Sequence, residues 1–81
     1  MRATWAEIIE NDLKTKPPSY AADFLRDALE DDEPGTLIVA MQHVSRARGG
    51  IDDLGLSEEE KARIATAIGR AIGAYPVLQA A

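Results

Sequence analysis

The sequence predicts a small all-α domain, a bundle of about four helices that takes in residues 1–81. Three observations lead to this prediction. Apolar residues recur at three- and four-residue spacing in four separate segments. Proline or glycine lies between each of these segments and the next. Two of the segments open with the Ser/Thr-x-x-Glu pattern of a helix capping box. A chain of 81 residues has room for one domain.

The first helix is expected at residues 5–14. Thr4 and Glu7 have the spacing of a capping box, in which both side chains satisfy free groups at the start of a helix. The proline pair at 17–18 ends the helix, because proline lacks an amide hydrogen and disfavours helical backbone in the residue before it. The apolar face consists of Trp5, Ile8, Ile9 and Leu13.

A second helix is expected to begin with Ser19 as its N-cap. Its apolar face consists of Ala21, Phe24, Leu25, Ala28 and Leu29. The acidic run 30–33, followed by Pro34 and Gly35, then ends the helix. Acids near the next helix start are favoured by the helix dipole. We interpret this run as a linker with capping residues, because it lacks the alternating ligand pattern of an EF-hand calcium loop.

The third helix is expected at residues 36–48. Its predicted core face is Leu37, Ile38, Met41, Val44 and either Ala47 or Ser45. Arg46 and Arg48 lie in the last turn, where cations complement the helix dipole, and the glycines at 49–50 supply a C-cap.

The fourth helix is expected to open with a capping box between Ser57 and Glu60 and to run to about Ala74. Its broad apolar face consists of Ile64, Ala65, Ala67, Ile68, Ala71 and Ile72. A short extra turn is expected at residues 51–54. The tail at 75–81 is apolar, so it either packs on the core or forms a contact surface.

Composition narrows the classes of function. The chain has no cysteine, which excludes disulfides and thiolate metal sites, and no metal is implied. Its formal net charge of −5 disfavours binding to a phosphate backbone. The N-terminus lacks the apolar run of a secretory signal, and no segment approaches the roughly 20 apolar residues of a membrane span. We therefore expect a cytoplasmic protein without a membrane partner.

No motif of catalysis is present. His43 is the only histidine, and no carboxylate or nucleophile stands at a distinctive spacing from it. The sequence has no GxGxxG, no phosphate-binding loop and no GxSxG. These observations favour a protein that is not an enzyme and that has no cofactor and no small-molecule substrate.

Residues 20–57 carry a family resemblance. The segment combines Ala22-Asp23-Phe24-Leu25, Ala28-Leu29, an acidic turn through Pro34, Ala40-Met41, Ala47-Arg48-Gly49 and Gly55-Leu56-Ser57. In this combination it resembles the addiction-module antidote family, short antitoxin-like proteins with a helix-turn-helix. The resemblance covers about half of the chain. It implies binding to a small toxin and, for many members, repression of their own promoter through the helix-turn-helix.

The helix-turn-helix of this chain is contracted and acidic, so its C-terminal half is expected to be only a degenerate form of the motif. Only residues 51–54 separate Gly50 from Gly55, which is barely one helical turn. The first residues of a recognition helix face base edges and phosphates. Here those residues are Glu58, Glu59 and Glu60.

Two functional hypotheses follow, from different classes. The first is an antitoxin-like protein that acts by contact with a toxin-like partner or with itself. Its expected partner-binding residues are Trp5, Ile9, Tyr75, Val77 and Leu78. The alternative is a dimeric DNA-binding repressor of its own operon. In that case the phosphate contacts would come from Arg46, Arg48, Lys61, Arg63 and Arg70. A third possibility is an oligomerisation module that retains the scaffold alone.

Overall fold

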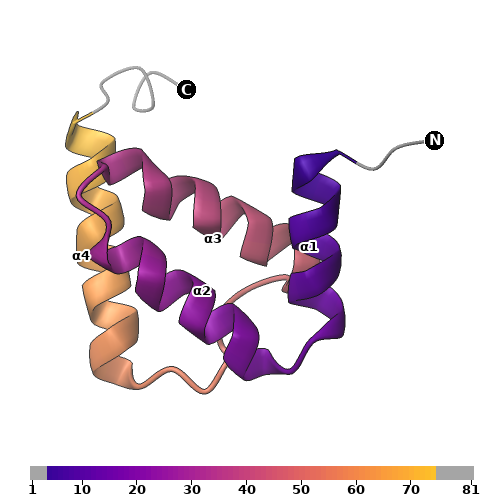
Figure 1. Ribbon diagram of the computed structural model, residues 1–81. Coiled ribbons are helices and arrows are strands. Elements are labelled where there is room, and N and C mark those ends of the chain that lie inside the picture. Colours follow the sequence, from indigo (N-terminus) through magenta and orange to yellow (C-terminus); the bar gives the residue numbers. More distant parts are fainter. Residues whose placement is uncertain (1–3, 75–81) are drawn as a thin grey trace.

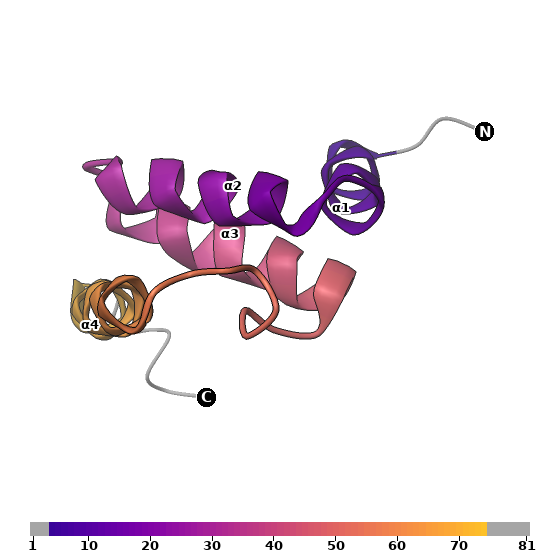
Figure 2. The ribbon, with the colours of Figure 1, turned by 90° about the horizontal axis from the view of Figure 1, so that it is seen from below.

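A computed structural model describes residues 4–74 of the chain and contains four helices in this range: α1 (Trp5–Thr15), α2 (Pro18–Glu30), α3 (Pro34–Arg48) and α4 (Glu58–Ala74). Helices α2 and α3 form an antiparallel hairpin, and α1 and α4 stand at opposite ends of it (Figure 1). Figure 2 looks along α1 and α4 and shows α2 and α3 running across the space between them. The prediction of a small all-α bundle is confirmed.

Helix α3 is the centre of the bundle, because it packs against each of the other three helices. The largest side chains that are fully shielded from solvent are Leu13, Leu25 and Val44, one from each of α1, α2 and α3. Alanines complete the core where helices approach closely, and α4 contributes its own buried side chains. These further core residues are Ala21, Ala22, Ala28, Leu37, Ala40, Ile64 and Ala71.

Capping and backbone geometry agree with most of the predicted helix ends. The Thr4 hydroxyl accepts a hydrogen bond from the Glu7 amide at 3.1 Å. At the end of α3, Gly49 adopts the left-handed conformation (φ 79°), and its amide donates to the Ser45 carbonyl. A side chain rarely tolerates that conformation, so glycine suits the position.

Two starts and two faces were predicted wrongly. Ser19 is not an N-cap: α2 begins at Pro18, and α3 begins at Pro34, two residues before its predicted start. Proline suits the first turn of a helix because that turn has free amides anyway and its φ is already helical. On α1, Trp5 and Ile8 are exposed, and only Leu13 of the predicted apolar face is fully buried. On α4, Ala65 is exposed.

The connection between α3 and α4 is a loop that is anchored in the core. Residues 51–54 form a turn, as predicted, in which the Leu54 amide donates to the Ile51 carbonyl at 3.4 Å. The side chains of Leu54 and Leu56 are both buried. This short loop therefore contributes to folding through two leucines. Among the described residues, no helix is long and apolar enough to cross a membrane.

Candidate partner-binding groove

Helices α1, α2 and α3 enclose an open groove of about 860 Å³. Its lining extends from α1 along the hairpin to the turn between α2 and α3, whose places are seen in Figure 1. The surface of the groove is mainly apolar. Its apolar lining residues are Trp5 and Ile9 from α1, Phe24 and Ala28 from α2, and Ile38, Val39 and Ala40 from α3.

Two of these apolar residues remain exposed to water, one largely and one by half. The side chain of Trp5 is 74% exposed and that of Val39 is 50% exposed. Burying such side chains typically gains about 1.5–3 kcal/mol each. The fold leaves much of this free energy unused for Trp5 and about half of it for Val39, so it remains for an interaction with another molecule.

The groove has an acidic rim, which we define as Asp27 and Asp31. These residues lie at the end of α2 and in the turn to α3. The Asp31 carboxylate accepts a hydrogen bond from the Glu33 amide at 2.7 Å, so it also shapes the turn. Within residues 4–74, no lysine or arginine lines the groove. Asp27 and Asp31 therefore place negative charge beside an apolar surface.

A polar contact beside the groove joins α1 to α3. His43 lines the groove, and its side chain is buried. Its Nδ1 lies 2.7 Å from Oε2 of Glu10, and Arg46 donates to the same oxygen at 3.2 Å. The hydrogen bond with His43, together with that from Arg46, lowers the pKa of Glu10 from its ordinary value. His43 is thus a structural histidine, held by a carboxylate of the neighbouring helix.

A smaller hollow of about 500 Å³ lies between α3 and α4. It shares Ile38 and Gln42 with the groove, so the two hollows lie on either side of these residues. Its other lining residues are Met41, Ser45, Arg46, Ile68 and Ile72. No cluster of three or more His, Asp or Glu side chains within residues 4–74 could hold a metal ion.

The groove contains two of the five residues that the sequence predicted for partner binding. Trp5 and Ile9 both line it, from successive turns of α1. The other three, Tyr75, Val77 and Leu78, lie outside the described residues. Sequence reasoning missed the contributions of α2 and α3. A signal for them existed in the consecutive apolar residues 37–41, because five adjacent positions on a helix cannot all face one core.

Three of the five residues predicted for phosphate contact are engaged within the chain. Arg46 pairs with Glu10. Arg48 donates to the carbonyl oxygens of Leu13 at 2.8 Å and Lys16 at 2.7 Å. Lys61 lies 3.3 Å from Glu58 and 4.0 Å from Asp52. The remaining two, Arg63 and Arg70, are exposed on α4.

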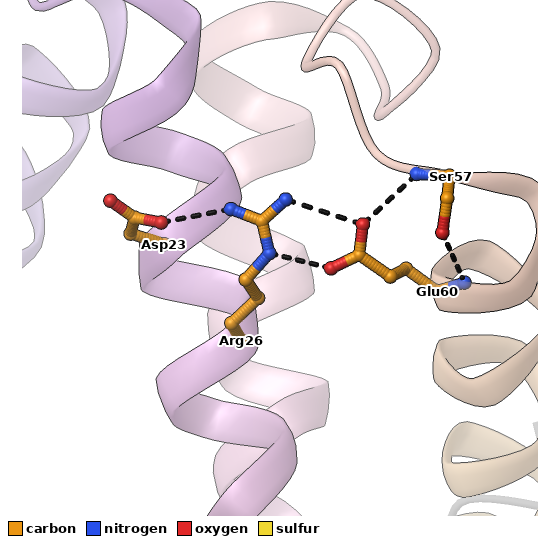
Figure 3. A network of polar contacts seen from close by, with 4 residues as sticks. All are labelled: Asp23, Arg26, Ser57 and Glu60. Atoms are coloured by element: carbon orange, nitrogen blue, oxygen red, sulfur yellow. Dashed lines mark hydrogen bonds and ion pairs between the residues drawn. The ribbon is translucent and has the colours of Figure 1, made fainter.

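The start of α4 is held by a network of polar contacts (Figure 3). Arg26 of α2 donates to both carboxylate oxygens of Glu60, at 2.6 and 3.2 Å, and also to Asp23 at 2.9 Å. The capping box is reciprocal: the Glu60 amide donates to the Ser57 hydroxyl, and the Ser57 amide donates to Glu60.

This network changes the acidity of Glu60. The hydrogen bond from Arg26 and then that from the Ser57 amide lower its pKa from 4.5 to about 2. The two carboxylates correspondingly raise the pKa of Arg26. Glu60, one of the three acids that head α4, therefore has a structural role.

Comparisons of the chain with known protein families, with curated proteins and with solved structures found no match. The case for function therefore depends on the residues of the groove and of the α4 start, and on the resemblance of residues 20–57.

Proposed function

We propose that this chain is a non-enzymatic, antitoxin-like protein that binds a toxin-like partner through the groove between α1, α2 and α3. The observation that carries the proposal is that Trp5 and Val39 are exposed to solvent while they line a mainly apolar groove. Aromatic side chains dominate the energetics of protein interfaces, because they bury a large area with few rotatable bonds. Trp5 is the only tryptophan of the chain and is the first choice for such a contact.

The resemblance to addiction-module antidotes supplies the class of partner. In the fold, its aliphatic positions on α2 serve the scaffold: Ala22, Leu25 and Ala28 are buried, and Gly49 ends α3. Phe24 belongs to the same segment and lines the groove. The buried positions thus hold the scaffold together, and the groove adds a surface on which a partner could act.

The alternative, a dimeric DNA-binding repressor, draws less support. Glu58 and Glu59 are exposed at the first turn of α4, where a recognition helix would meet phosphates. Repulsion there would oppose binding. A mobility-shift assay on the upstream region of the gene at low salt tests this function: a salt-sensitive shift that Arg63→Ala abolishes would favour the repressor.

Isothermal titration with the protein encoded by the neighbouring gene tests the leading proposal. We expect binding that Trp5→Ala weakens by about tenfold or more, in the range of an interface hot spot. Ile8→Ala is the matched control, because Ile8 is 51% exposed on the same helix but does not line the groove. Absence of binding by the unmodified chain would contradict the proposal.

A further inference from the structure

We infer that the occupant of the groove is a basic amphipathic helix of about two turns, presented by another protein. This inference rests on the proposed function and specifies the chemistry of the partner. It is carried by two features together: the apolar lining of the groove and the acidic rim beside it.

The dimensions of the groove suit a helix. On α3 its lining extends from Gly35 to His43, eight residue steps or about 12 Å at the rise of an α-helix. Apolar anchors at i, i+4 and i+7 of a docked helix extend over about 10 Å. Helix-in-groove recognition uses anchors with this spacing.

The charge of the groove selects a cationic partner. Asp27 lies in the last turn of α2, where the helix dipole is negative and favours cations. The last turns of α1 and α3 contain Lys14 and Arg46 as the dipole favours, whereas that of α2 contains no base. Asp27 forms no ion pair within the described part of the chain. A lysine or arginine beside the apolar anchors of a partner would neutralise it.

A second copy of this chain fits the groove less well. Each copy carries a formal charge of −5, so two copies repel each other. The acidic rim would add to this repulsion. Charge thus favours a partner of different composition.

The test uses a synthetic peptide and does not depend on any natural partner. The peptide has about 15 residues, enough for a marginally stable helix, with leucines along one face and lysines on the flanks. A second peptide has glutamate in place of every lysine, and a third has the same composition as the first without an apolar face. None contains an aromatic residue. The emission of Trp5, the sole tryptophan, therefore reports binding directly.

Binding of the lysine peptide, with a blue shift of Trp5 emission, is expected. Affinity should fall by about tenfold between low and physiological salt, and the two other peptides should bind more weakly by a similar factor. Asp27→Asn with Asp31→Asn should weaken binding by about tenfold. The asparagine at 31 retains an acceptor for the Glu33 amide. The matched double variant Asp53→Asn with Glu59→Gln removes the same charge outside the groove and should bind as the unmodified chain does.

Val39→Ser and Ile8→Ser form the apolar pair of variants. Both residues are about half exposed, at 50% and 51%, but only Val39 lines the groove. Only Val39→Ser should weaken the peptide complex. Equal effects of the two variants, equal binding of the glutamate peptide, or no binding of the lysine peptide would each overturn the inference. So would self-association of the chain that Val39→Ser abolishes. If the neighbouring gene product still bound in any of these cases, the proposed function would stand without the inference.

Discussion

Helix α2 takes part in two regions of different chemistry, a network of paired charges and a mainly apolar groove. Toward α4, Asp23 and Arg26 join the polar network with Glu60 (Figure 3). Toward α1 and α3, Phe24 and Asp27 border the groove. Asp23 and Asp27 are one helical turn apart on the same helix. Asp23 has Arg26 three residues later, whereas Asp27 has Glu30 there.

The difference shows how the position of one base, Arg26, separates the two aspartates of α2, Asp23 and Asp27. Where Arg26 is within reach, carboxylates from two helices become part of the fold. Asp27 of the acidic rim forms no ion pair within residues 4–74, so its charge stays in solvent beside exposed apolar groups. The first contact should therefore affect stability, and the second should affect binding.

The largest effect on stability is expected in the core, where a substitution should cost far more than a substitution in the groove. Leu25→Ala should lower the free energy of unfolding by about 2–5 kcal/mol, because Leu25 is fully buried and its truncation leaves a cavity. Val39→Ala should change it by no more than about 0.5 kcal/mol. Urea denaturation followed by circular dichroism measures both. A large loss for Val39→Ala would mean that the groove belongs to the core.

Arg48 provides the next test, since it holds α1 against the end of α3. Its two charge-assisted hydrogen bonds to carbonyl oxygens of α1 and the following residue should be lost in Arg48→Ala. We expect a loss of about 1–3 kcal/mol in the free energy of unfolding. Arg46→Ala is the control, because the Arg46 side chain is 61% exposed, and it should cost less. If the two variants lost the same free energy of unfolding, Arg48 would not hold α1 more firmly than Arg46 does.

The helices and their order could be predicted because their signals are local. Apolar periodicity, prolines and the capping boxes act within a few residues. All four helices were found, although α2 and α3 begin earlier than these signals predicted. The exposure of Trp5 and Ile8 could not be predicted in this way. A periodic apolar face shows that a helix can pack, but the crossing of α1 over the hairpin decides how much of that face is covered.

The candidate site was only partly predictable for the same reason. Trp5 and Ile9 were selected because large apolar side chains on short helices, aromatic ones above all, are common interface contacts. The places of Val39 and Asp27 in the groove depend on how three helices meet. Arg48 was expected to complement its own helix dipole or to bind phosphate. It instead donates to carbonyls more than 30 residues away in sequence, which no local pattern can indicate.

A smaller effect is expected when a serine that caps a helix is compared with a serine that does not. Ser57→Ala should lower the free energy of unfolding by about 1 kcal/mol, because the Glu60 amide loses its acceptor. Ser19→Ala should have almost no effect, since the side chain of Ser19 caps no helix. Thermal and urea denaturation of both variants would show the difference. A cost for Ser19→Ala as large as that for Ser57→Ala would contradict this description of the two helix starts.

The last prediction concerns the pH dependence of the polar contact. The pKa of Glu60 in the folded chain is about 2, below its ordinary 4.5, so the folded state favours the carboxylate. The stability that this group contributes is complete above pH 4.5 and is lost as the pH falls from 4.5 to 2. Solvent screens the pair, because the side chains of Arg26 and Glu60 are 41% and 27% exposed. The effect should therefore be modest.

Glu60→Gln isolates this contribution from those of the other acids. Urea denaturation between about pH 2 and pH 7 should give a shallower loss of stability for Glu60→Gln than for the unmodified chain. Glu59→Gln removes the same charge from the neighbouring exposed position, so it should retain the steeper loss. If all three proteins lost stability in parallel, Glu60 would not be a structural acid. The comparison between the two sides of α2 would then retain only the prediction that the groove affects binding.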